Sequence, residues 1–112
     1  MEVRAVAKNT GIPASKVRPL VNLVRGKRVD EALTLLRFTP TPKAKIVAKV
    51  VRSAVANAEN NFQIDPADLK VVRIYVDEAR SMRRFRPRSR GRVSPIRKHS
   101  SHITVVVAEQ EG

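Results

Sequence analysis

The sequence predicts an α+β domain, in which three helices pack on a small three-stranded antiparallel sheet and a long β-hairpin arm protrudes from it. Three observations lead to this prediction. Apolar residues recur at helical spacing in three segments of the first half of the chain. Residues 2–8, 69–79 and 101–109 have the alternation or the β-branched content typical of strands. The last two strands are joined by a long arginine-rich stretch, which has turn residues near its middle.

The composition is that of one folded, intracellular domain. We expect the 112 residues to form a single domain, 1–112, of which about 79–99 is the arm. The chain has no cysteine, so disulfides and thiolate metal sites are excluded. No apolar run approaches the ~20 residues that span a bilayer, and the opening residues lack the apolar core of a signal peptide. A cytoplasmic protein with no membrane association is expected.

The net charge of +13 is concentrated in one stretch. Residues 80–98 contain no Asp or Glu, while the other 93 residues, with 14 basic and 10 acidic side chains, contribute only +4. The nine cations of the stretch are Arg80, Arg83, Arg84, Arg86, Arg88, Arg90, Arg92, Arg97 and Lys98. Such a balance indicates a polyanionic partner. The few apolar residues of the stretch make no continuous face, which disfavours a membrane-surface helix and favours nucleic acid.

The first predicted helix follows the strand at residues 2–8. Its apolar residues recur at helical spacing: Val17, Leu20, Val21 and Val24. Gly26 is placed to end it. Ser15 is a plausible N-cap, but Pro19 has no amide to bond back. Either the first turn is irregular or the regular helix begins near Pro19.

Two more helices are predicted before the second strand. Asp30 is expected to be an N-cap, with Glu31 in the first turn near the positive end of the helix dipole. The third helix, roughly 42–60, has Thr41 as its N-cap and Pro42 at the first helical position, where its missing N–H costs nothing. Its apolar stripe consists of Val47, Val50, Val51, Ala54, Val55 and Ala58.

The connection between the last two strands is too long for a hairpin loop. Twenty-six residues separate Val76 from Ile103. A disordered loop is one arrangement, and two strands that continue outward as an arm are the other. Turn residues lie near the middle of this connection, at Pro87, Ser89 and Gly91, and they favour the arm. Flanks of about ten residues would reach roughly 30 Å, and a bare two-stranded ribbon is marginal in water, so a partner is expected to order it.

Several segments match a known family in residue type and spacing. Arg83 is followed at fixed spacing by Arg88-Ser89, by Gly91-Arg92 and by the run HITVVV at residues 102–107. SKVRPLVNLVRGK at residues 15–27, AKVVRSAVANAENN at residues 48–61 and VDEARSMRRFRPRSRGR at residues 76–92 support the match. Over essentially its full length the chain resembles the L-twenty-two family of bacterial large-subunit ribosomal proteins.

The resemblance implies a body on the outside of the large subunit and a hairpin along the wall of the nascent-peptide exit tunnel. It implies a structural constituent that binds 23S rRNA, aids subunit assembly, and is a monomer within the ribosome. Its partners would be neighbouring large-subunit ribosomal proteins and the nascent polypeptide, and it would have no enzymatic activity.

The positions of the cations and the resemblance together indicate which residues carry these roles. The residues expected to bind rRNA are Ser15, Lys16, Arg18, Arg25, Lys27, Arg80, Arg83, Arg84, Arg86, Arg88, Arg90, Arg92, Arg97 and Lys98. Those expected to line the tunnel are Met82, Arg83, Arg84, Arg88 and Arg90. The chain departs from the family at Ala79-Arg80, where Gly-Pro is common, which bears on a bend at the base of the arm.

Enzymatic function is disfavoured by the residues themselves. Asp77-Glu78 could serve a metal-dependent nuclease only if the carboxylates converged, but neighbours on a strand point to opposite faces. No nucleophile triad, Gly-rich phosphate loop or HExxH motif occurs, and no cofactor or metal site is predicted. The alternative binding function is an architectural DNA-binding protein with basic β-arms, in which Pro87 would wedge base steps.

Overall fold

The computed structural model describes residues 2–8, 10–79, 82–88 and 92–109, and along residues 82–88 and 92–98 it describes the backbone alone. The elements are β1 (Glu2–Ala7), α1 (Ala14–Val24), α2 (Val29–Arg37), α3 (Pro42–Phe62), a 3-10 turn (Pro66–Asp68), β2 (Leu69–Glu78), β3 (Met82–Arg88), β4 (Arg92–Lys98) and β5 (Ser101–Glu109). The predicted fold class, three helices on a three-stranded antiparallel sheet with a protruding hairpin, is confirmed.

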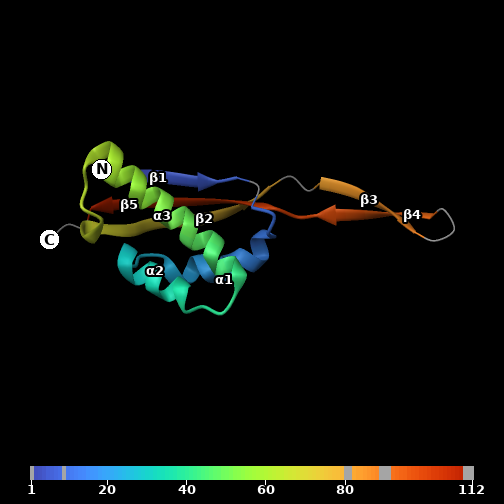
Figure 1. The fold of residues 1–112 in the computed structure, drawn as a ribbon, viewed down its shortest axis with the longest axis horizontal. Helices are drawn as coiled ribbons and strands as arrows, with labels where there is room; N and C mark the ends of the chain where they lie inside the picture. The colour runs from blue at the N-terminus through green and yellow to red at the C-terminus, as the bar shows by residue number, and fades with distance from the viewer. Residues whose placement is uncertain (1, 9, 80–81, 89–91, 110–112) are drawn as a thin grey trace.

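The sheet is built around its last strand. Its order is β1-β5-β2, and β5 runs antiparallel to both neighbours. Val105 of β5, for example, lies opposite Ala5 of β1 on one side and Ile74 of β2 on the other. The three helices cover one face of this sheet (Figure 1), with α3 over β1 and β5, α1 against β2, and α2 against α3.

The core lies between the helices and the covered face of the sheet. Val47 and Val51 of α3, and Ile103, Val105 and Val107 of β5, are fully buried. Valine lowers the intrinsic helix propensity of α3, so burial of this stripe must stabilise the helix. The predicted stripe is buried except for Val55, which is partly exposed. Among the described residues no helix is both long and apolar enough to cross a membrane.

The start of α1 differs from the prediction. The helix begins at Ala14, with Pro13 in the N-cap position and no side-chain capping bond, so Ser15 is not its N-cap. Pro19 lies inside the helix, and the helix continues past it to Val24. The carbonyl of the exposed Ser15 therefore loses one helical donor, which solvent can replace. Gly26 has φ of 78° just beyond the last turn, as predicted.

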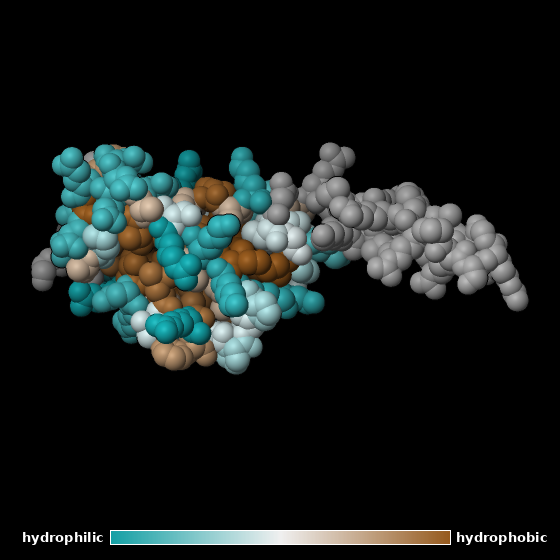
Figure 2. All heavy atoms as spheres, viewed as in Figure 1, coloured by the Kyte–Doolittle hydropathy of each residue, from teal (hydrophilic) through white to brown (hydrophobic). Residues whose placement is uncertain are grey.

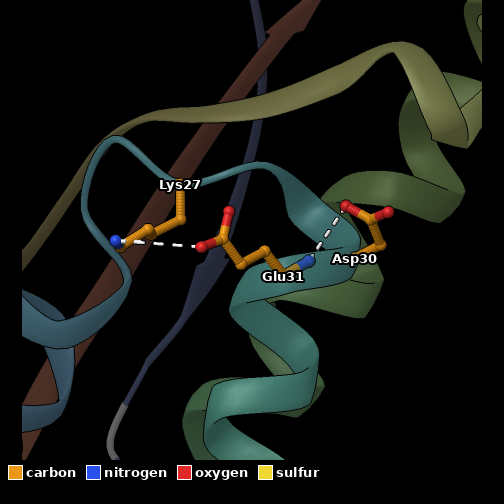
Figure 3. Close-up of polar contacts among 3 residues, drawn as sticks. All are labelled: Lys27, Asp30 and Glu31. Atoms are coloured by element: carbon orange, nitrogen blue, oxygen red, sulfur yellow. Dashed lines mark hydrogen bonds and ion pairs between the residues drawn. The ribbon is translucent and has the colours of Figure 1, made fainter.

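The second and third helices start by different means. Arg28, not Asp30, holds the N-cap position of α2, but the Asp30 carboxylate still accepts a hydrogen bond from the Glu31 amide at 2.9 Å (Figure 3). For α3 the prediction of Thr41 as N-cap and Pro42 as first residue is confirmed. This helix ends at Phe62, two residues later than predicted, followed by Gln63 with φ of 57°.

The arm extends from the end of the sheet where β2 finishes and β5 begins (Figure 1). β3 and β4 pair antiparallel from Met82 opposite Lys98 to Arg88 opposite Arg92, which leaves residues 89–91 as their connection. The molecule measures 66 × 27 × 17 Å, and its radius of gyration is 17.1 Å. A compact chain of this length would have about 13 Å, so the arm accounts for the elongated shape. The predicted tip residues Ser89 and Gly91 lie outside the described residues.

The arm joins the sheet with a shift of register. The last pair of the body is Glu78 opposite Ser101, and the first pair of the arm is Met82 opposite Lys98. The chain thus advances four residues on one strand and three on the other. One extra residue on one strand bends and twists a β-ribbon. The family departure at Ala79-Arg80 falls in this segment, although Arg80 itself lies outside the described residues.

Candidate nucleic-acid interface

The backbone of the arm carries most of the predicted site. Arg83, Arg84, Arg86 and Arg88 lie on β3, and Arg92, Arg97 and Lys98 on β4. Arg80 and Arg90 lie outside the described residues. Of the predicted tunnel-lining residues, Met82, Arg83, Arg84 and Arg88 are therefore on β3.

The register of the arm brings like charges to opposite positions. Arg83 is opposite Arg97, and Arg88 is opposite Arg92. Like charges directly opposite one another destabilise a strand pair. A two-stranded ribbon with this register gains stability when an anion neutralises it.

The base of the arm lies beside the start of α1. Pro13, Ala14 and Ser15 line a hollow of about 220 Å³ together with Glu78, Ala79, His99 and Ser100 at the base of the arm. Ser15, which was predicted to bind rRNA, therefore lies close to the base of the arm, although the two segments are far apart in sequence. Ser15 is exposed on this side.

Hydrogen bonds fix the loop before α1 to the first residues of β5. The amide of Thr10 donates to the Ser101 carbonyl at 3.0 Å, and the two hydroxyl oxygens lie 2.8 Å apart. The amide of Gly11 donates to the Ser100 hydroxyl at 2.9 Å, and that of Ala79 to the Ser100 carbonyl at 3.0 Å. Ser101 is fully buried. These bonds hold the start of α1 and the base of the arm in one arrangement.

The remaining predicted residues of α1 face solvent. Lys16 and Arg18 are exposed, whereas Val17 and Val21 are buried in the core. The amphipathic pattern that places the apolar residues inward thus presents both cations outward. Both are free to meet a polyanion that also contacts the base of the arm.

Arg25 has an intramolecular role that the sequence did not reveal. Its guanidinium donates to the side-chain oxygen of Asn22 and to the backbone carbonyl of Ile74, both at 2.8 Å. The second bond joins the end of α1 to β2. Arg25 is still exposed, so contact with a partner is compatible with this role.

Lys27 pairs with an acidic residue of the next helix. Its ammonium nitrogen lies 3.9 Å from a carboxylate oxygen of Glu31, and both side chains are about half exposed (Figure 3). The turn that carries Lys27 is bonded to β2, because the Gly26 amide donates to the Val71 carbonyl and the Val71 amide donates to the Lys27 carbonyl. An exposed ion pair of this kind contributes little stability and can be exchanged for a phosphate contact.

The uncovered face of the sheet holds basic residues that the predicted site did not include. Arg4 and Arg73 lie on the two sides of Val106, and Lys70 is further along β2; all three cations are exposed. Tyr75 is exposed beside them, and Glu2 forms an ion pair with Arg73. The strand alternation in the sequence carried the signal, because it predicts Arg4 on the side opposite Val3.

The described residues offer electrostatic binding of a polyanion. Across the ranges that the structure describes, no group of three His, Asp or Glu side chains could hold a metal ion. An extended cationic arm, with further cations on α1 near its base, suits contact with a polyanion along its length.

Comparison with known proteins assigns a family to this arrangement. Residues 5–108 match the family model described as "Ribosomal protein L22p/L17e". A protein of Dehalococcoides mccartyi named "Large ribosomal subunit protein uL22" is 66% identical over 109 residues, which cover 97% of this chain and 100% of the relative. Proteins of the same name from Pediococcus pentosaceus and a Thermoanaerobacter species are 53% and 52% identical, over 97% and 99% of this chain and 93% and 100% of the relatives. The chain belongs to the L22p/L17e family of ribosomal proteins, the uL22 proteins of the large subunit.

Proposed function

We propose that this chain binds 23S rRNA chiefly through its β-hairpin arm, aids assembly of the large subunit, and lines the nascent-peptide exit tunnel with that arm. As a uL22 protein of bacteria it is a structural component of the cytoplasmic ribosome and not an enzyme. We take residues 1–112 as one domain, with about 79–99 as the arm. The observation that carries the proposal is the protruding ribbon of β3 and β4, which lies within residues 80–98, a stretch whose sequence holds nine cations and no acid.

The charge of the arm sets the expected strength of binding. Neutralising each phosphate contributes about −0.7 to −0.9 to the slope of log K against log salt. If all nine cations engaged, the slope would be roughly −6 to −8. The rest of the chain, with a net charge of only +4, supplies a smaller share.

The choice of arginine favours folded RNA as the partner. Eight of the nine cations of the arm are arginine and one is lysine. A planar guanidinium forks onto phosphate and also stacks on bases, whereas an ammonium acts as a point charge. Folded RNA presents both groups at close range.

A second contact region is proposed at the base of the arm. Ser15, Lys16 and Arg18 are exposed on α1, and Ser15 shares a hollow with the arm's first residues. Arg25 and Lys27 belong to the proposed rRNA-binding set as well. For Lys27, phosphate contact would replace its ion pair with Glu31.

The tunnel-lining role is proposed for Met82, Arg83, Arg84, Arg88 and Arg90. Its support is the length of the molecule, 66 Å, which lets the arm reach far from a body held at the subunit surface. In this role the arm would meet the nascent polypeptide. The chain would act as a monomer within the ribosome.

The rRNA role is tested by crosslinking the protein in cells and sequencing the bound nucleic acid. We expect 23S rRNA fragments, with crosslinks gathered on the arm and the start of α1. Recovery of scattered genomic DNA instead would support the architectural DNA-binding alternative and contradict the proposal.

The tunnel role needs a separate test. Ribosomes in which residues 82–84 are deleted should respond differently to antibiotics that bind in the exit tunnel, because the deletion reshapes the wall. Deletion of the last three residues, 110–112, is the control of equal size. Unchanged drug response and unchanged translation in the 82–84 deletion would contradict tunnel placement while leaving rRNA binding intact.

A further inference from the structure

A groove runs between α2 and α3 on the helical side of the molecule, away from the arm. It has a volume of about 450 Å³. Its floor is apolar and is formed by Leu33 and Leu36 of α2 and by Ala44 and Ala48 of α3. Figure 2 shows hydrophobic surface between these helices, bordered by hydrophilic side chains. Figure 1 places α2 farther from the arm than α1. The groove is therefore separate from the proposed rRNA contacts.

The charged residues that line the groove are all basic. Arg37 comes from α2, and Lys45 and Arg52 come from α3. No acidic residue lines the groove in the described part of the chain. Complementary charge at protein interfaces selects partners and fixes their register, so the occupant should carry carboxylates.

An exposed aromatic residue lies between two groove-lining residues in the sequence, Arg37 and Thr39. Phe38, at the C-cap of α2, is 75% exposed, the most exposed of the large hydrophobic residues that the structure describes. The guanidinium of Arg37 lies 5.8 Å from the centre of its ring. Aromatic residues and arginine are enriched at the centres of protein interfaces. We therefore expect a partner protein to cover the phenyl ring and the guanidinium.

We propose that this groove is the docking site for an acidic segment of a neighbouring large-subunit ribosomal protein, which inserts an aliphatic side chain between α2 and α3. A protein segment fits better than RNA, because the floor of leucine and alanine matches an aliphatic side chain. Threonines also line the groove, but the hydroxyls of Thr34 and Thr39 already donate to the backbone carbonyls of Asp30 and Leu35. Phosphates laid over such a floor would lose hydration without gaining hydrogen bonds from it.

The spacing of the cations constrains the partner further. Lys45 and Arg52 are seven residues apart on α3, about 10 Å along its axis at a rise of about 1.5 Å per residue. Carboxylates that meet both cations would be about three residues apart in an extended segment, at about 3.3 Å per residue. In a helix they would be about seven residues apart. The proposal rests on membership in the large subunit and not on which residues bind rRNA.

The test is photocrosslinking in assembled large subunits. A benzophenone amino acid replaces Phe38 in one strain and Phe62 in the control strain. Phe38 lies between the groove-lining residues Arg37 and Thr39, whereas Phe62 is 47% exposed at the end of α3, ten residues beyond the groove-lining Arg52. After irradiation, the Phe38 adduct is expected to be a peptide of another ribosomal protein, with an aliphatic residue flanked by Asp or Glu. An adduct to rRNA, to a second copy of this chain, to a peptide without acidic residues, or no adduct would overturn the proposal.

A charge-reversal pair tests the electrostatic part. Lys45→Glu should lower the yield of the Phe38 adduct about tenfold, whereas Lys49→Glu on the same helix, which is exposed but lies outside this groove, should leave it unchanged. Equal loss in both variants would overturn the proposal. The affinity of the free chain for 23S rRNA is measured in parallel. A loss specific to Lys45→Glu would make the groove an rRNA site, and failure of the wild-type chain to bind rRNA would refute the proposed function alone.

Discussion

The body and the arm of this protein are supported in different ways. In the body, β5 has a partner strand on each side and helices over one face, and its side chains from Ile103 to Val107 are buried. In the arm, β3 and β4 form a separate sheet of two strands. A ribbon of this kind is marginal on its own in water, whereas a helix-covered sheet is not.

The two regions also differ in charge. The stretch at residues 80–98 holds nine of the 23 Lys and Arg residues and none of the ten Asp and Glu residues. Hydrophobic burial stabilises the body, while repulsion between like charges opposes the pairing of β3 with β4. From this difference we expect the body to fold by itself and the arm to become ordered only together with a polyanion.

Removal of the arm should have the largest effect, and it should fall on binding alone. When residues 80–98 are replaced by a short turn, the body should unfold at nearly the same temperature, because the helices and β1, β2 and β5 supply a continuous core among the described side chains. The slope of log K for 23S rRNA against log salt should shrink by about 3 to 8 units, which corresponds to half or all of the nine cations. Filter binding over a salt series measures it.

A full-length arm with the nine cations changed to glutamine is the matched control. It separates the charge of the arm from its length. If the slope of log K against log salt is unchanged in both variants, the body, not the arm, dominates binding.

A cavity in the core should have the opposite effect: it should lower the stability of the body and leave rRNA binding almost unchanged. Ile103→Ala removes a fully buried side chain from the central strand and should cost about 2–5 kcal/mol. The melting temperature should fall by roughly 10–20 °C, measured by calorimetry, with little change in the salt slope. Val6→Ala, at a position that is 43% exposed, is the control and should stay within about 0.5 kcal/mol. Equal losses of stability in the two variants would contradict the assignment of Ile103 to the core.

A smaller loss of stability is expected when a hydrogen bond is removed at the junction between the body and the arm. Ser101→Ala leaves the Thr10 hydroxyl without its partner at 2.8 Å, and should cost about 1–3 kcal/mol. Faster amide exchange is expected at Thr10 and Gly11, whose N–H groups bond to Ser101 and Ser100. Thr10→Val together with Ser101→Ala should cost less than the sum of the two single changes, since they share one interaction. Strict additivity would show that the hydroxyls do not interact.

The smallest effect is expected at Lys27. Lys27→Ala removes an exposed ion pair with Glu31 and should change stability by less than about 0.5 kcal/mol. The salt slope for rRNA should fall by about one unit if this lysine meets a phosphate. A stability loss well above that figure with an unchanged slope would assign Lys27 to the fold instead of the interface.

Local pattern was enough to predict most elements of the body. The apolar stripe of α3 and the pair Thr41 and Pro42 placed that helix, since burial and capping act over a few residues. The start of α2 was misplaced because it depends on a distant contact: Arg28 forms a bridge with Lys70 of β2. The start of α1 differed because Pro13 occupies the N-cap position in place of Ser15.

Features that depend on long-range packing could not be read from the sequence. The central place of β5, the bond from Arg25 to the carbonyl of Ile74, and the hollow that joins Ser15 to the base of the arm all connect segments many residues apart. The groove between α2 and α3 likewise exists only once the two helices are packed. The arm itself was predictable, because its length, charge and central turn residues are all local.

Hydrogen exchange in the free chain and in the assembled large subunit tests the central claim most directly. The amides of β5 and of the paired residues of β1 and β2 should be protected in both states, since the body folds alone. The amides of β3 and β4 should exchange rapidly in the free chain and slowly in the subunit, where rRNA neutralises the arm. Equal and strong protection of β3 and β4 in the free chain would contradict the account.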